Sequence, residues 1–194
     1  LSIGNQRKRI NKTITMRITF NAPFTLWFSF IAIGALILQV LLGVNFTFTV
    51  LDGQFNFSDW TDYVSLFGYI FGHANWAHYL GNFSIILLIG PILEKSLGAK
   101  KLAIYTGITT LVIAIIHILF WDHGLIGASG VAFMMIVLVS LVGRKGNEVP
   151  LTFILIFILF VGKEFLSSFD DDQVSQFAHI CGGAMGVVLG MWKR

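Results

Sequence analysis

The sequence is poor in charge and in cysteine, and each shortage excludes a class of protein. Only 12% of its 194 residues are charged, whereas a soluble domain usually has about 25%. The hydrophobic share is 56%, so the composition predicts a polytopic membrane protein that folds as one compact bundle. Cys181 is the single cysteine, which excludes an intrachain disulfide and a cysteine-rich metal site.

A cleavable targeting signal is also not evident. The first apolar run, 23–42, is long enough to span a membrane, and no convincing small-residue cleavage site follows it. The segment 1–21 is polar and basic toward its start, and we expect it to be a cytoplasmic tail. Residues 22–194 are expected to form a single transmembrane domain.

Six apolar segments follow one another along the chain, and each predicts a helix. The first, third and fifth are near the length of about 20 residues that a spanning helix needs. The other three carry polar residues near their N-terminal ends. The segments are 23–42, 76–93, 102–121, 129–143, 149–165 and 177–192. The expected fold class is therefore an all-α membrane protein with a bundle of six transmembrane helices.

The charged residues divide between two sets of connecting segments. All Lys and Arg residues except Lys163 lie in the N-terminal segment, the second and fourth connections and the C-terminal end. All seven Asp residues lie in the other connections. Because basic loops stay on the cytoplasmic side, both termini are expected in the cytoplasm. A nucleic-acid partner is not expected, because the basic residues do not form one soluble surface.

The connection 45–75 is long for a compact bundle, which suggests a role beyond joining two helices. Its many aromatic residues, interspersed with Asp and Asn, suit the boundary between membrane and water. We expect this loop to lie in the outer leaflet of the bilayer.

Ser129 lies between glycines at the start of an apolar run that is too short to cross a bilayer. A helix from Ser129 to Arg144 would measure about 22 Å, against a hydrocarbon core of about 30 Å. If Arg144 marks the inner face, Ser129 lies inside the membrane. The tetrapeptide Gly127-Ala128-Ser129-Gly130 is then either a helix-packing device or the site of a nucleophile.

Three more polar side chains are predicted at a similar depth. Counted along a helix from Lys193, His179 lies at about 21 Å, and counted from Lys95, Asn82 and His78 lie at about 20 and 25 Å. Polar groups inside a membrane normally face the bundle interior or a wet cavity, so a shared depth favours their meeting. Each of them also has a plain structural interpretation, as an interhelical hydrogen-bonding group.

The last apolar segment carries a stripe of small residues below its histidine. His179, Gly182, Gly183, Gly186 and Gly190 fall within about one third of the helix circumference. Such stripes let two backbones approach closely. Helix packing alone explains the glycines but not the histidine above them, whereas a serine–histidine dyad needs both.

Three further histidines, His73, His117 and His123, also lie near the outer side. They could compete with His179 as the base, or with one another as metal ligands. The sequence contains no HExxH motif and no close set of carboxylates and histidines, so we expect no metal site.

Several short motifs occur in a fixed order along these segments. They are the pair His78-x-x-x-Asn82, the run Glu94-Lys95-x-x-Gly98, the segment Gly127-x-Ser129-Gly130, and the run from Ala178-His179 through Gly182 to Gly186. Over about residues 23–192 the chain closely resembles the rhomboid family of intramembrane serine proteases, in motif order and in six-helix layout.

The resemblance implies a serine–histidine dyad without an acidic third member. Ser129 would be the nucleophile, and His179 would act first as general base and then as acid for the leaving amine. The oxyanion would be held by His78, Asn82 and the backbone N–H of Ser129.

The resemblance also assigns supporting residues. Phe133 is expected to stack on the histidine, because the family usually has an aromatic residue at this position. Gly127 and Gly130 would allow the backbone geometry around the nucleophile. Gly182 and Gly186 would support close helix packing.

The substrates implied are single-span membrane proteins with a locally unstable transmembrane helix. The protein would reside in the cell membrane with its active site open to the outer side, and it would need no cofactor. The sequence does not predict its oligomeric state. The alternative is a catalytically silent relative that binds membrane clients. A transporter is a third possibility, but it predicts repeat symmetry that the sequence does not show.

Two positions depart from the family pattern. Val64 and Ser65 stand where many relatives have a Trp-Arg pair that pins the long loop, so we expect this loop to be held differently. Val137 replaces a usual glycine, which places more weight on Gly182 and Gly186. Glu94 is expected to be structural, with bonds near the inner helix ends.

Overall fold

The computed structural model describes residues 17–43, 51, 54–142, 144, 148–156, 158–159 and 173–192. Regular structure in this part of the chain is helical. The elements are α1 (Pro23–Leu42), α2 (Trp60–Gly68), the 3-10 turn η2 (Tyr69–Phe71), α3 (Trp76–Leu97), α4 (Ala99–Phe120), α5 (Ser129–Leu141) and α7 (Gln173–Met191).

Five of the predicted segments correspond to these helices. α1 has the predicted bounds, whereas α3 runs past the predicted end at residue 93 and stops at Gly98. Gly98 has φ +84°, a left-handed conformation that glycine adopts readily and that ends the helix. The fifth predicted segment, 149–165, is helical at 151–156 and 158–159, and its other residues are at a loop end or outside the described part.

The helices indicate a multi-pass membrane protein. α1, α3 and α4 are long and apolar enough to cross a membrane, and α5 and residues 176–191 of α7 form shorter apolar helices. The all-helical class is therefore confirmed for the described residues. The count of six spanning helices stays a prediction.

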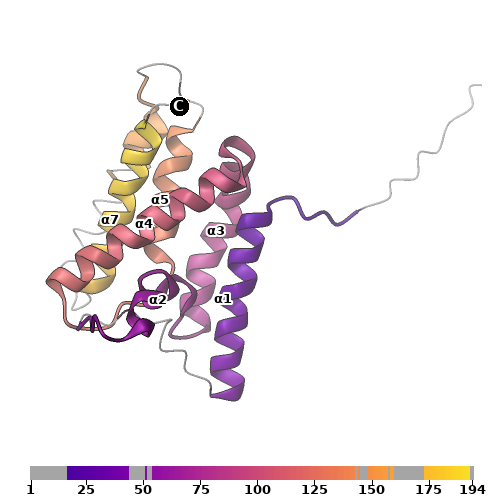
Figure 1. Cartoon of the computed structure of the whole chain (residues 1–194). Coiled ribbons are helices and arrows are strands. Elements are labelled where there is room, and N and C mark those ends of the chain that lie inside the picture. Colours follow the sequence, from indigo (N-terminus) through magenta and orange to yellow (C-terminus); the bar gives the residue numbers. More distant parts are fainter. Residues whose placement is uncertain are drawn as a thin grey trace, which may run out of the picture.

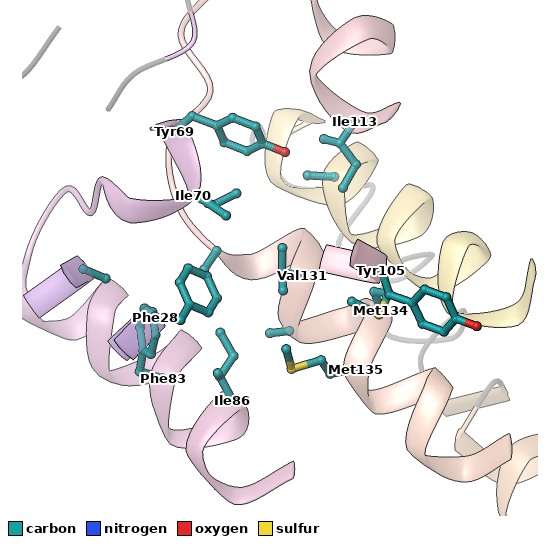
Figure 2. Close-up of a cluster of buried hydrophobic side chains, with 14 of the residues drawn as sticks. Phe28, Tyr69, Ile70, Phe83, Ile86, Tyr105, Ile113, Val131, Met134 and Met135 are labelled. Carbon is teal, nitrogen blue, oxygen red and sulfur yellow. The ribbon is translucent and has the colours of Figure 1, made fainter. Parts of the chain in front are cut away.

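The helices form two closely packed pairs joined by a crossing helix. Figure 1 shows α1 beside α3 and α5 beside α7, with α4 running obliquely across them. The most extensive contact is the one between α5 and α7. In the buried core, Phe28 of α1 meets Phe83 of α3 edge to face at 5.1 Å. Figure 2 shows Val131 and Met135 of α5 on the other side of this core.

The start of α1 is fixed to the end of α3. Pro23 is favourable at the first helical position, but Ala22 before it has no polar side chain to cap the helix. The buried carboxylate of Glu94 accepts the backbone N–H groups of Phe24 and Thr25, at 2.9 and 3.1 Å, and the hydroxyl of Thr25 at 2.8 Å. The structural role expected for Glu94 is therefore confirmed.

The connection 45–75 contains structure that its composition did not predict. α2 begins after Asp59, whose side chain accepts the backbone N–H of Thr61 at 2.9 Å. The helix has reversed polarity, because its apolar side chains are exposed at the helical spacing i, i+3, i+4, i+7 and its buried residues include a serine and a glycine. The exposed set is Trp60, Tyr63, Val64 and Phe67.

The same connection is held to the bundle by backbone and tyrosine bonds. Ser65 stands at a position of the absent Trp-Arg pair, and its hydroxyl donates to the carbonyl of Asp62 within α2. The hydroxyl of Tyr69 donates to the carbonyl of Thr110 on α4 at 3.1 Å. Leu51 and Leu125 form an antiparallel bridge with N–H to carbonyl distances of 2.9 and 2.8 Å. This bridge brings the connection against the loop that leads into α5.

Candidate active site

Ser129 is the first residue of α5. Ala128 before it has φ −90° and ψ 9° and no side-chain group that could cap the helix. The first N–H groups of a helix have no acceptor within it, and the helix dipole makes this end partially positive. The backbone at Ser129 is therefore suited to bind an anionic group.

Gly127 brings the chain before Ser129 against the start of α3. Its φ of +113° lies in a region that other residues rarely adopt, and its N–H donates to the carbonyl of Tyr69 at 2.9 Å. A Cβ atom at Gly127 would lie 2.6 Å from Nε2 of His78 and 3.5 Å from Nδ2 of Asn82. Only glycine fits here, and both predicted oxyanion residues border it.

Small residues bring α5 and α7 into backbone contact. A Cβ atom at Gly182 would overlap the carbonyl oxygen of Gly130, and one at Gly130 would lie 3.0 Å from the carbonyl oxygen of Ala178. Further along, a Cβ at Gly186 would lie 2.6 Å from the carbonyl oxygen of Met134. Gly182 and Gly186, expected to support close packing, thus lie where the backbones of α5 and α7 approach each other. The backbone at Gly130 and Ala178 thus meets directly next to Ser129 and His179.

The imidazole of His179, a residue of α7, packs against α5. It stacks on the ring of Phe133, with centroids 4.1 Å apart and an interplanar angle of 11°. Phe133 follows Ser129 by four residues, so both lie on one face of α5. The stacking expected from the resemblance is present, and it places the His179 ring against a residue that lies one helical turn after Ser129.

Asn82 and His78 occupy the first turns of α3. Asn82 is buried, and its amide nitrogen lies 3.2 Å from Nε2 of His73. His78 donates its backbone N–H to the side chain of Asn75, which caps α3. The rings of His73 and His78 meet edge to face at 5.1 Å.

The remaining histidines separate into two groups. His73 contacts the oxyanion residues, whereas Nε2 of His117 donates to the carbonyl of His123 at 2.7 Å. The His117 ring stacks on Trp121, which contacts Phe177 at the start of the described side chains of α7. Within the described residues, no three His, Cys, Asp or Glu side chains are grouped as metal ligands.

Sequence reasoning missed the contribution of two residues. From the sequence, His73 is a possible competing base or metal ligand, and Tyr69 is one of the aromatic residues of the connection 45–75. Both precede α3 in a turn, where no helical or strand spacing relates them to Asn82 or Gly127. The available signal was His73 itself, a histidine five residues before His78.

Comparison with known families places this arrangement. The Rhomboid domain model matches residues 60–194, from α2 through the C-terminal end. The chain belongs to the rhomboid family. A search of curated proteins returned no match. Rhomboid-family proteins are mostly intramembrane serine proteases, and the matched region contains every residue of the candidate site.

Proposed function

We propose that this rhomboid protein is an intramembrane serine endopeptidase with a Ser129–His179 dyad. The observation that carries the proposal is the stack of His179 on Phe133, together with the backbone contact of Gly130 with Gly182. These contacts hold the His179 imidazole against Phe133, which lies one helical turn after Ser129. A packing role alone gives no reason for this pairing.

The reaction follows from the two side chains. His179 accepts the proton of the Ser129 hydroxyl while the oxygen attacks the carbonyl carbon of the scissile peptide bond. The tetrahedral intermediate collapses when His179 returns the proton to the leaving amine. Water then hydrolyses the acyl-enzyme with His179 again as base. The Phe133 ring orients the imidazole, which in other serine proteases is the task of a carboxylate.

The oxyanion is stabilised from three directions. The Ser129 N–H lies at a helix N-terminus, and Asn82 and His78 border the backbone of Gly127 just before it. Removal of one such donor typically lowers the rate by about 10²–10³-fold. Gly127 and Gly130 allow the backbone geometry and the close approach of neighbouring groups around the nucleophile.

The substrates are transmembrane segments of single-span proteins. A helical segment has its carbonyls hydrogen-bonded and shielded, so a cleavable segment must be locally unwound. On this proposal residues 22–194 form one transmembrane domain, residues 1–21 and the C-terminus lie in the cytoplasm, and the site opens to the outer side. The polar residues at the start of α3 and α5 would keep water at the site.

Substitution of Ser129 by Ala tests the proposal. Purified wild-type protein in liposomes is expected to cleave a panel of single-span substrates, and Ser129→Ala is expected to lose cleavage while its unfolding temperature is unchanged. Ser140→Ala is the matched control, because Ser140 lies at the other end of α5 and bonds the carbonyl of Val137. Cleavage retained by Ser129→Ala would overturn the assignment.

A fluorophosphonate probe separates an active enzyme from a silent client-binding relative. Labelling is expected in the wild type and is expected to disappear in His179→Ala, because an unactivated serine reacts poorly. A wild-type protein that neither cleaves nor labels would support the silent alternative.

A further inference from the structure

His73 is a buried histidine that the dyad mechanism does not use. It lies between η2 and α3 with no exposed surface. Both of its ring nitrogens have partners, because Nδ1 lies 3.3 Å from the carbonyl oxygen of Phe71 and Nε2 lies 3.2 Å from the amide nitrogen of Asn82. A fully buried histidine with this pairing is an element of a hydrogen-bond chain.

The chemistry of the partners fixes the direction of this chain. A carbonyl oxygen can only accept, so Nδ1 of His73 carries the ring proton. Nε2 is then an acceptor, and it takes one of the two N–H groups of the Asn82 amide. The bond therefore selects the amide orientation with nitrogen toward His73, rather than the flipped orientation with oxygen there.

The selected orientation matters for the space next to Ser129. The Asn82 amide nitrogen that bonds His73 also lies 3.5 Å from the position of a Cβ on Gly127. The amide nitrogen, which has a second N–H besides the one that bonds His73, therefore borders the backbone that leads to the nucleophile. A flipped amide would present its oxygen at the place of the donor, and an acceptor repels an oxyanion.

We propose that His73 is a positioning residue that acts through Asn82 on the oxyanion. This proposal rests on the proposed function. His73 accepts one amide N–H, holds the other toward the reacting carbonyl, and supports the His78 ring by an edge-to-face contact at 5.1 Å. The carbonyl of Phe71 fixes the ring in turn, so the chain from η2 through His73 to Asn82 sets the geometry of the donor.

The surroundings keep His73 in the required form. Burial and then the nearby His78 lower the pKa of His73 from 6.5 to about 4. The ring is therefore neutral at physiological pH, and Nε2 retains the lone pair that the Asn82 amide needs. A protonated ring would donate from Nε2 and would favour the flipped amide.

Two substitutions of His73 separate positioning from packing. His73→Phe keeps the ring and its aromatic neighbours but removes the acceptor, and it is expected to lower kcat about tenfold or more with KM nearly unchanged. The upper limit is the loss of about 10²–10³-fold that follows complete removal of one oxyanion donor. His73→Gln supplies an amide oxygen as a new acceptor and is expected to restore most of kcat. Wild-type kcat in His73→Phe would overturn the proposal.

A double-mutant cycle with Asn82→Ala makes the test specific. In the Asn82→Ala background, His73→Phe is expected to cost no further kcat, because its effect passes through the amide. Tyr79→Phe is the control, since its ring lies 5.5 Å from His73 but its hydroxyl pairs with Ser29 of α1. It is expected to leave kcat unchanged and to show no coupling. Additive effects of His73→Phe and Asn82→Ala would overturn the proposal.

A spectroscopic measurement on the wild type tests the proposal without requiring that any variant folds. Nitrogen-15 NMR of labelled histidine at pH 7 is expected to show His73 with a protonated Nδ1 and an unprotonated Nε2. The opposite tautomer or a charged ring would contradict the proposal. Wild-type protein that cleaves and labels while His73 fails these tests leaves the proposed function intact, whereas absence of both activities removes the proposed function itself.

Discussion

At the scale of single residues, the histidines differ because of their surroundings. His179 stacks on an aromatic ring beside a helix N-terminus, which suits proton transfer to and from a serine. His78 borders Gly127, which suits contact with a substrate carbonyl. His73 is enclosed and paired at both nitrogens, which suits the orientation of a neighbour. On the proposed function, one residue type thus provides three roles, and the packing around each ring decides which.

The lowered pKa of His73 predicts a pH dependence of stability. The unfolded chain binds a proton at His73 below about pH 6.5, while the native ring, next to His78, Tyr79 and Asn82, stays neutral down to about pH 4. The native state therefore binds fewer protons in this window, and stability falls as the pH drops from 6.5 toward 4. The unfolding temperature in detergent is expected to fall less between pH 7 and pH 5 in His73→Gln than in the wild type. Parallel curves for the two proteins would contradict this.

At the scale of helices, the pair α5 and α7 depends on glycine. The backbone of α7 approaches the backbone of α5 most closely at Gly130. Further close contacts with α5 follow at Gly186 and at Gly190. The position of His179 relative to Ser129 is a consequence of this approach. Any atom added between the two backbones moves one helix along or away from the other.

Gly182→Ala is expected to separate α5 from α7. Its methyl group would overlap the carbonyl oxygen of Gly130, which is backbone and cannot rotate away. Overpacking of this kind costs about 1–3 kcal/mol, and movement of His179 is expected to lower kcat about tenfold or more. The measurements are unfolding in mixed micelles and cleavage of a single-span substrate.

Gly107→Ala on α4 is the matched control for that substitution. A Cβ at Gly107 meets no atom within 4 Å, and alanine is favoured over glycine in a helix by about 0.5–1 kcal/mol. This variant is expected to be active and no less stable than the wild type. Equal behaviour of the two variants would show that the close approach at Gly182 does not position the site.

The exposed apolar face of α2 leads to a prediction about where this helix lies relative to the membrane. Its exposed aromatic face requires a lipid environment, so the helix is expected to lie at the membrane boundary with this face toward the acyl chains. In a variant with Trp60 as its single tryptophan, lipids brominated near the headgroup are expected to quench the fluorescence more than acrylamide does. A tryptophan at position 58 in a tryptophan-free background is the control, because Ser58 precedes the helix. Quenching of Trp60 by acrylamide alone would contradict the prediction.

At the scale of the whole molecule, the helix pairing sorts the charges into two ends. Glu94 bonds the start of α1 at the end of α3, so Arg17, Lys95 and Lys100 lie toward one end of the bundle. Asp59 and Asp122 lie toward the other end, where α2 and the loop before α5 meet through the Leu51–Leu125 bridge. By the positive-inside rule, we expect the first end to face the cytoplasm.

Accessibility of single cysteines tests this orientation. In a Cys181→Ser background, Ser58→Cys is expected to react with a membrane-impermeant maleimide added to intact cells. Lys100→Cys is expected to react only after the membrane is permeabilised. The reverse pattern would contradict the assigned topology and, with it, a site that opens to the outer side.

The sequence by itself determined the class of protein, most helix positions and the residues of the candidate site. Apolar runs decide which segments enter a membrane, and helical spacing decides which side chains share a face, so 23–42 and the face of His179 with Gly182 and Gly186 were predictable. The tertiary structure alone decided what lies in the described part of the connection, residues 51 and 54–75. Local propensity allows α2 to form, but only its packing against the bundle shows that its apolar side chains are the exposed ones.

The tertiary structure also decided how the site is supported. Gly127, His73 and Asn82 come from a loop, a turn and a helix, and no periodic spacing relates residues that meet through such connections. The Leu51–Leu125 bridge and the bond from Gly127 to Tyr69 hold the segments together. Local sequence chemistry thus determined which groups are present, and long-range packing decided which nitrogen of His73 faces Asn82 and which way its amide points.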